Sequence, residues 1–306
     1  STSLTLTPRE YSVAVPSLSQ STTIEATLGG DTDLSFYRFR LDNDPNGMSA
    51  WFIRPDGIVN LAGLSEGAHT VFFELATQSF VAESVNDPSA YKSPIMSASF
   101  RVDTVSPEIG QVAYSLPSGA SSLTQENQVV AYQETGSAAV ALINALDPTP
   151  ASGIVNAQVE SLDDQGQVLS TVIIPFTPIL QLSAALPAGF NQYRVQLIDA
   201  AGNESEATML SSIMGDSQAP TGTLSRLSEQ QTRVVNVTLQ LDYQDADASP
   251  LFYRLYQTDQ SPGAWQSLPS GPDPVALNFA LTPGDSGDRI VTGDIRDAAG
   301  RVTALN

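Results

Sequence analysis

An internal repeat constrains the fold of this chain more than any other feature. Phe36-Tyr37-Arg38 begins a segment that runs to Trp51, and Phe252-Tyr253-Arg254 begins a matching one that runs to Trp265. The chain has only these two tryptophans, which lie 15 and 13 residues after their phenylalanines. A third, diverged copy fits between them. Repetition at roughly 100 residues predicts a string of similar domains rather than one large active site.

The local pattern predicts strands almost everywhere. Apolar and polar residues alternate over short runs, as in Val234 to Leu241, and the 20 prolines and 21 glycines are spread evenly. Turn signals recur about every 8 to 12 residues, which is typical of all-β sandwiches. We therefore predict an all-β chain of tandem sandwiches in an elongated arrangement.

Two junctions mark the expected domain boundaries. In 101–107 and in 215–220 an acidic residue precedes a proline, and a fresh alternating stretch follows. Proline stiffens a link and suits the start of a first strand, because it cannot donate to a sheet ladder. These junctions predict three domains, at 1–104, 105–218 and 219–306.

A late hairpin is shared by the second and third domains. It reads Asp199-Ala200-Ala201-Gly202-Asn203 in one and Asp297-Ala298-Ala299-Gly300-Arg301 in the other. Asp opens a type I turn, the alanines take right-handed conformations, and Gly takes the left-handed position. The first domain lacks this hairpin, and 84–92 reads as a longer, irregular loop there.

These phrases resemble the tandem immunoglobulin-like, or fibronectin type III-like, repeats of large bacterial surface and secreted proteins. The resemblance rests on Asp147 to Ile154, on Leu64 to Val71 and on the two Asp-Ala-Ala-Gly hairpins, which together touch all three expected domains. It implies three tandem immunoglobulin-like β-sandwiches that act as stalks, spacers or binding modules. It also implies an extracellular or cell-surface location in a bacterium.

The amino-acid composition excludes several classes of binding partner. The net charge is 13 − 33 = −20, so the chain should repel nucleic acid and anionic membranes. It has no cysteine, which excludes disulfides and thiolate chemistry, and no apolar run long enough to insert into a membrane. It begins with Ser rather than Met and has no signal peptide, so we expect a mature product or a piece of a longer chain.

Few residues point to catalysis. His69 is the only histidine, and its place in an expected strand indicates packing rather than a catalytic triad. Lys92 is the only lysine and lies between two prolines, which argues against internal Lys–Asn cross-links. No phosphate-binding glycine loop or histidine metal motif is present. We predict neither an enzyme nor a required cofactor.

Acidic loops are the best functional lead. In such a sandwich, the loop after the second strand and the final hairpin lie at the end that faces the preceding domain. We therefore expect two groups of aspartates near the linkers: Asp245, Asp247 and Asp297 near Asp216, and Asp147 and Asp199 near Asp103. Carboxylates from several loops suit Ca²⁺, which takes six to eight oxygens. The alternative is that Asp is simply a good turn residue.

A separate acidic run copies the first six positions of an EF-hand loop. It reads Asp42-Asn43-Asp44-Pro45-Asn46-Gly47, which makes Asp42, Asp44 and Asn46 candidate Ca²⁺ ligands. The twelfth position, which should be Glu, is Ile53, and no flanking helices are expected. A strand-connecting turn is the competing interpretation.

Two functions remain open. The first is a non-catalytic spacer that holds a distal adhesive or enzymatic part away from the cell, with neighbouring domains of a longer chain as partners. The second is a binding module for a host-surface protein or a glycan, with recognition on the irregular 79–93 loop of the first domain. The recurring aromatics Tyr37, Trp51, Tyr253 and Trp265 are expected to pack within the sandwiches, although an exposed sugar-stacking platform is an alternative.

Overall fold

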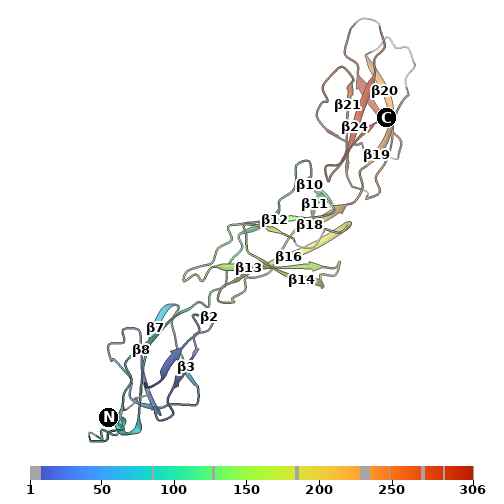
Figure 1. Cartoon of the computed structure of the whole chain (residues 1–306). Coiled ribbons are helices and arrows are strands. Elements are labelled where there is room, and N and C mark those ends of the chain that lie inside the picture. Colours follow the sequence, from blue (N-terminus) through green and yellow to red (C-terminus); the bar gives the residue numbers. More distant parts are fainter. Residues whose placement is uncertain are drawn as a thin grey trace, which may run out of the picture. The chain divides into compact units, whose positions relative to one another are not determined.

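In the computed structural model the chain is almost entirely β (Figure 1). The structure describes residues 8–84, 86–125, 128–182, 186–227, 235–247, 249–269, 273–284 and 287–305. Val85 of the 79–93 loop and Val234 of the alternating run lie outside these residues. Within them no helix has the length and apolar character that a membrane span requires.

The chain forms two compact units. The first comprises residues 1–108, 146–156 and 197–206, and the second comprises 109–145, 157–196 and 207–306. The division into three domains at 1–104, 105–218 and 219–306, and their elongated arrangement, stay predictions. Along the chain, however, the described strands build three successive pairs of sheets, each with one three-stranded sheet and one larger sheet.

The first pair of sheets comprises β1 to β8. The smaller sheet has the order β1-β3-β6, from Tyr11–Ala14, Ile24–Gly30 and Ile58–Leu61. The larger has the order β2-β8-β7-β4-β5, from Leu18–Ser19, Met96–Val102, Gly67–Ala76, Phe36–Leu41 and Phe52–Ile53. A short helix, α1 (Gln78–Val81), follows β7, and Thr77 caps it.

The second pair comprises β9 to β18. The smaller sheet has the order β15-β12-β9, from Ile179–Gln181, Ala139–Ile143 and Gln111–Tyr114. The larger has the order β10-β11-β18-β16-β13-β14, from Ser122–Gln125, Gln128–Glu134, Ser212–Asp216, Gly189–Asp199, Ile154–Leu162 and Val168–Pro175. A further short strand, β17 (Thr208–Met209), pairs with β16.

The third pair comprises β19 to β25. The smaller sheet has the order β19-β20-β23, from Thr221–Arg226, Asn236–Gln244 and Val275–Ala280. The larger has the order β22-β21-β24-β25, from Gln266–Ser267, Leu251–Gln257, Val291–Asp297 and Val302–Leu305. This order of antiparallel strands is that of an immunoglobulin-like sandwich, as the sequence predicts.

Alternation along the strands places the cores between paired sheets. In β3 the residues Ile24, Ala26 and Leu28 are buried while those between them are exposed. They pack in one cluster with Val71, Phe73 and Leu75 of β7 in the facing sheet. Burial of alternate residues against a second sheet is the arrangement that stabilises a sandwich.

The Phe-Tyr-Arg repeat has a structural cause. Arg38 of β4 lies directly opposite Glu74 of β7, and its Nε donates to the Glu74 carboxylate at 2.7 Å. The guanidinium carbon lies 4.7 Å from the centre of the Trp51 ring. Because Trp covers the guanidinium, the Arg–acid pair is shielded from solvent.

The second copy repeats this stack residue by residue. Arg254 of β21 lies opposite Asp294 of β24, Nε donates to the carboxylate at 2.7 Å, and the guanidinium carbon lies 4.4 Å from the Trp265 ring centre. Between them, Glu160 of β13 and Arg194 of β16 form an ion pair with the two charges exchanged. Tyr37 and Tyr253 pack against the cores, as the sequence analysis predicts. Trp51 and Trp265 instead lie outside the core clusters and stack on the two arginines.

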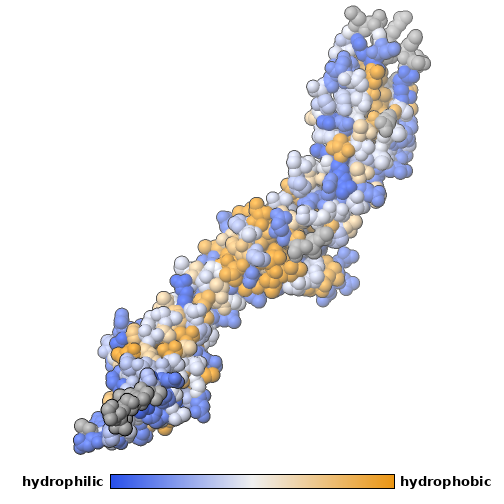
Figure 2. Space-filling model, in the orientation of Figure 1, coloured by the Kyte–Doolittle hydropathy of each residue, from blue (hydrophilic) through white to orange (hydrophobic). Residues whose placement is uncertain are grey.

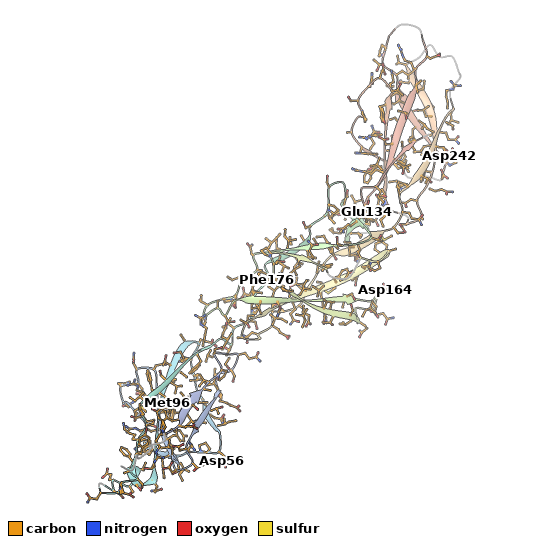
Figure 3. The ribbon with its side chains drawn as sticks, in the orientation of Figure 1. Asp56, Met96, Glu134, Asp164, Phe176 and Asp242 are labelled. Atoms are coloured by element: carbon orange, nitrogen blue, oxygen red, sulfur yellow. The ribbon has the colours of Figure 1, made fainter. Side chains whose placement is uncertain are left out.

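Strand β14 differs from the strands at the corresponding edge of the other two larger sheets. It ends the order of its sheet and has eight residues, whereas the edge strands β5 and β22 have two each. Apolar residues gather on the surface around the elements labelled β12, β13 and β16 in Figure 1, as Figure 2 shows. Asp164 and Phe176, labelled in Figure 3, lie just before and just after β14.

Candidate metal centre

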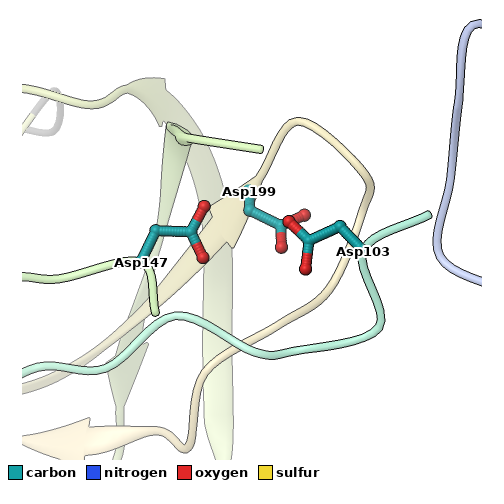
Figure 4. Close-up of side chains that lie close together, drawn as sticks. All are labelled: Asp103, Asp147 and Asp199. Atoms are coloured by element: carbon teal, nitrogen blue, oxygen red, sulfur yellow. The ribbon is translucent and has the colours of Figure 1, made fainter. Parts of the chain in front are cut away.

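Three aspartates converge within the first unit. Asp103 follows β8, Asp147 lies in the loop between β12 and β13, and Asp199 ends β16 at the hairpin (Figure 4). One oxygen from each carboxylate lies within 4.8 Å of the others. Two oxygens bound to one Ca²⁺ at about 2.4 Å each are at most about 4.8 Å apart, so the three fit a single ion. Sequence analysis predicts this grouping, and its role in metal binding stays a prediction.

Main-chain amides orient the three carboxylates. Asp103 accepts from Val105 N at 3.1 Å and from Ser152 N at 2.6 Å, so the linker residue is bound by the 147–153 loop. Asp147 Oδ2 accepts from Gly153 N at 2.6 Å. Because the loop amides fix these carboxylates before any ion binds, the cost of ordering the site is reduced.

The hairpin fixes the third carboxylate. Asp199 Oδ1 accepts from the amides of Gly202 and Asn203 at 2.7 and 2.8 Å. Gly202 has φ = 97°, in the left-handed region that the turn requires of glycine. The sequence therefore predicts both the turn and the position of Asp199.

The first cluster brings three carboxylate groups close together. Burial raises the pKa of Asp147 above its usual value, and the charges of Asp103 and Asp199 add to the effect, although the Gly153 amide opposes it. Asp147 Oδ1 is buried and has no hydrogen-bond partner among the described residues. A cation at this place would supply the missing partner and neutralise the three charges.

The second unit places its predicted aspartates at corresponding points of the chain. Among the described residues, however, only Asp103, Asp147 and Asp199 bring three ligand oxygens within 4.8 Å of one another. Asp216 ends β18, Asp297 ends β24 at its hairpin, and Asp245 and Asp247 follow β20. Asp216 and Asp297 have no solvent exposure, and one carboxylate oxygen of each (Oδ2) lacks a hydrogen-bond partner within the described ranges. Buried carboxylate oxygens without a partner are costly, so a cation or a proton at this place would be favourable.

Electrostatics support that interpretation. Burial raises the pKa of Asp216 to about 7, and the nearby charge of Asp297 acts in the same direction. Burial also raises the pKa of Asp297, where the charge of Asp245 contributes and the amides of Arg301 and Gly300 oppose the shift. Carboxylates this close to one another favour a shared proton or a shared cation.

The remaining two aspartates of the second group stabilise loops. Asp245 accepts from Asp247 N and from the amide and hydroxyl of Ser249. Asp247 accepts from Ser217 N at 2.7 Å and from Gln218 N at 3.1 Å, so it binds the linker just after Asp216. Although burial tends to raise the pKa of Asp247, these amides outweigh it and leave the pKa lowered.

One pair of functional residues is missed by the sequence analysis. Asn203 Nδ2 donates to the main-chain oxygen of Asp103 at 2.8 Å, and Arg301 Nη2 donates to that of Asp216 at 3.1 Å. Both residues follow Asp-Ala-Ala-Gly directly. The sequence could have indicated this pair, because the residue that follows Asp-Ala-Ala-Gly is polar in both hairpins.

The EF-hand-like run is a turn between β4 and β5. Asp42 accepts from Thr70 N at 2.7 Å and contacts His69 Nδ1 at 2.8 Å, while Asp44 accepts from the main chain and side chain of Asn46. Among the described residues, no group of three acidic or histidine ligand atoms within 4.8 Å of one another includes Asp42 or Asp44. Their role as Ca²⁺ ligands stays a prediction.

His69 is buried, and both of its ring nitrogens form hydrogen bonds within the first sandwich. Ser65, His69 and Asp42 resemble a catalytic triad, with Ser65 Oγ 3.4 Å from Nε2. However, Nε2 lies 2.7 Å from the main-chain oxygen of Ser65, which can only accept a hydrogen bond. Nε2 must therefore carry a proton and does not serve as a general base in this conformation.

The sole lysine and the irregular loop are also bound within the first sandwich. Lys92 pairs with Glu74, the same buried acid that binds Arg38. Ser79 and Ser89 both bond to Asp87, which orders the 79–93 loop. The proposal that this loop recognises a ligand stays a prediction.

Comparisons with known proteins identify no relative by sequence: no family model and no curated protein matches. Among solved structures, the chain is similar to fibronectin(III)-like modules of Clostridium thermocellum CbhA, with 15% identity, 72% of this chain and 100% of that chain covered, and a TM-score of 0.38. It is also similar to chicken CNTN1 FN1–FN3 domains, with 10% identity, 97% of each chain covered, and a TM-score of 0.34.

Proposed function

We propose that this chain is a non-catalytic spacer from a bacterial extracellular or cell-surface protein, and that Ca²⁺ stiffens its domain junctions. It would hold neighbouring domains of a longer chain at a set distance. The observation that carries the proposal is the capture of a linker aspartate by two loops of the following sandwich. Ser152 N binds the Asp103 carboxylate and the Asn203 amide binds its main-chain oxygen.

Related contacts between linker and loops occur at the second junction, which supports a mechanical role. At the second junction Ser217 N donates to Asp247, and the Arg301 guanidinium donates to the main-chain oxygen of Asp216. A catalytic or recognition site need not recur in each domain, whereas a joint between domains does. The joint is strengthened further if a cation bridges linker and loop carboxylates.

Calcium is favoured among cations because the candidate ligands are hard oxygens. Ca²⁺ accepts carboxylate and main-chain oxygens in flexible geometry, whereas structural zinc sites use sulfur and nitrogen ligands, and the chain has no cysteine. At the second junction the support for a cation is the pair of buried, unpartnered oxygens of Asp216 and Asp297.

Calorimetric titration of the whole chain with Ca²⁺ tests the proposal. We expect two binding sites, one of which is lost in Asp147→Asn and the other in Asp297→Asn. Asp56→Asn, an exposed turn residue labelled in Figure 3, serves as the matched control and should leave both sites intact. The absence of saturable Ca²⁺ binding in the unaltered chain would refute the calcium part of the proposal.

A further inference from the structure

Strand β14 is a longer edge than its equivalents in the other two larger sheets. The equivalent edge strands in the first and third sandwiches, β5 and β22, have two residues each, and a tryptophan that covers an arginine lies just before each. β14 has eight residues and no such tryptophan. A long edge strand presents a row of unpaired amide and carbonyl groups, so proteins normally shorten or charge it.

The exposed side chains of β14 are apolar. Leu169 is 68% and Ile173 is 57% exposed, and both lie on the same outward face as Thr171. A hydroxyl–carboxylate contact from Thr171 to Glu160 of the neighbouring strand identifies that face. Exposed apolar side chains along an open edge are typical of an interaction surface rather than of a solvated strand.

A groove of about 190 Å³ borders β14. Leu169, Val172 and Ile174 of β14 line it, with apolar residues such as Val159 and Tyr193 and polar residues such as Ser161 and Asn191. A strand added to β14 would place its own inward-facing side chains beside this groove. Apolar side chains of β14 are therefore available to an added strand on both faces of the sheet.

An uncharged edge is the place where two copies of this acidic chain can meet with least repulsion. The net charge of −20 makes two copies repel over most of their surfaces, but none of the residues 168–175 is charged. The preceding turn carries Asp163 and Asp164. In an antiparallel pair of β14 strands centred on Thr171, Asp164 would lie opposite Pro178, so the two acidic turns lie at opposite ends of the pair.

The sequence of β14 also complements itself. In the same register Leu169 of one copy lies opposite Ile173 of the other, and the reverse pair forms across the twofold axis. Directly opposed apolar side chains are the units that stabilise an antiparallel pair. We propose that β14 is a homodimer interface, in which two copies of this chain join their sheets by antiparallel pairing about Thr171.

Sedimentation of the whole chain over a wide range of concentration tests this interface. We expect a reversible dimer, and Ile173→Glu should raise its dissociation constant at least about tenfold, because it places like charges at the interface. The control is Ile53→Glu, since Ile53 is 76% exposed on the two-residue edge strand β5, and it should leave the dissociation constant unchanged.

Amide hydrogen exchange on the unaltered chain tests the same interface without a variant. Exchange of the β14 amides should slow as the concentration rises, while exchange of the β5 amides stays constant. A chain that is monomeric at every concentration overturns the proposal. A dimer that Ile173→Glu does not weaken, in a variant that melts like the unaltered chain, also overturns it.

Discussion

The side-chain amide of Asn203 donates a hydrogen bond to the main-chain oxygen of Asp103, at 2.8 Å and across 100 residues of sequence. The same amide group donates to Asp199 Oδ2, also at 2.8 Å. One side chain thus joins the linker to the turn that holds a candidate metal ligand. Through this contact the hairpin helps to fix the position of the linker.

Removal of this amide should weaken the first junction. We expect Asn203→Ala to lower the free energy of unfolding by about 1 to 2 kcal/mol, because two hydrogen bonds of a half-buried side chain are lost. Chemical denaturation measures the change. Asn60→Ala, at an exposed position of β6, is the control and should change stability by less than about 0.5 kcal/mol. Equal effects of the two substitutions would contradict the role assigned to Asn203.

The buried acid Glu74 should matter more at neutral than at acid pH. Burial tends to raise its pKa, but Lys92 and Arg38 outweigh burial and leave the pKa lowered in the folded chain. Its stabilisation is therefore present above the unfolded pKa, near 4.3, and is lost as the pH falls through the folded pKa.

We expect Glu74→Gln to cost about 2 kcal/mol at pH 7. The difference from the unaltered chain should shrink in acid, as followed by urea denaturation at several pH values. A cost that is the same at pH 3 and pH 7 would show that packing, rather than charge, explains the effect.

The single histidine offers a direct titration. Burial lowers the pKa of His69, but the hydrogen bonds to Asp42 and to the Ser65 carbonyl outweigh it and raise the pKa above its usual value. The stabilisation is therefore fully present below about pH 6.5 and is lost as the pH rises through the folded pKa.

NMR of the imidazole protons should report a pKa above 6.5 in the unaltered chain and a lower one in Asp42→Asn. Because the chain has one histidine, no assignment is needed. A pKa at or below 6.5 would contradict the hydrogen-bonded imidazolium inferred from the geometry.

The substitution Asp216→Asn should raise the stability of the chain without metal and lower it in Ca²⁺. Without metal, the substitution removes a buried carboxylate that lies near Asp297 and Asp245, so stability at pH 8 should rise by about 1 kcal/mol. With saturating Ca²⁺, it removes a ligand, so stability should fall relative to the unaltered chain. Thermal melts in EDTA and in Ca²⁺ measure both changes, and the same sign in both conditions would argue against a bound cation.

Sequence reasoning predicts the positions of Asp199 and Asp297 because each begins a tight turn at the end of a strand, and turns follow local rules. The Asp-Ala-Ala-Gly phrase specifies its own hairpin, and the strand order of a sandwich then brings Asp199 toward the linker. The recurrence of the Phe-Tyr-Arg phrase likewise predicts repeated packing. These inferences need only local periodicity and a known order of strands.

Other contacts depend on register, which no local pattern reports. The partners of Arg38 and Arg254 follow from pairing across two strands that are about 40 residues apart. The capture of Asp103 by Ser152 N depends on the shape of a loop, and the polar residue after the hairpin glycine differs between the copies, Asn203 in one and Arg301 in the other. The length of β14 similarly becomes visible only when it is compared with β5 and β22 in their sheets.

Small-angle X-ray scattering of the whole chain, in Ca²⁺ and then in EDTA, tests the spacer account most directly. The account predicts an extended particle on the order of 100 Å long, from three sandwiches placed end to end. It also predicts greater flexibility in EDTA, and no response to Ca²⁺ when Asp147→Asn and Asp297→Asn are combined. A compact particle in both conditions would contradict the spacer, and an extended particle that is indifferent to EDTA would contradict the cation-stiffened junctions.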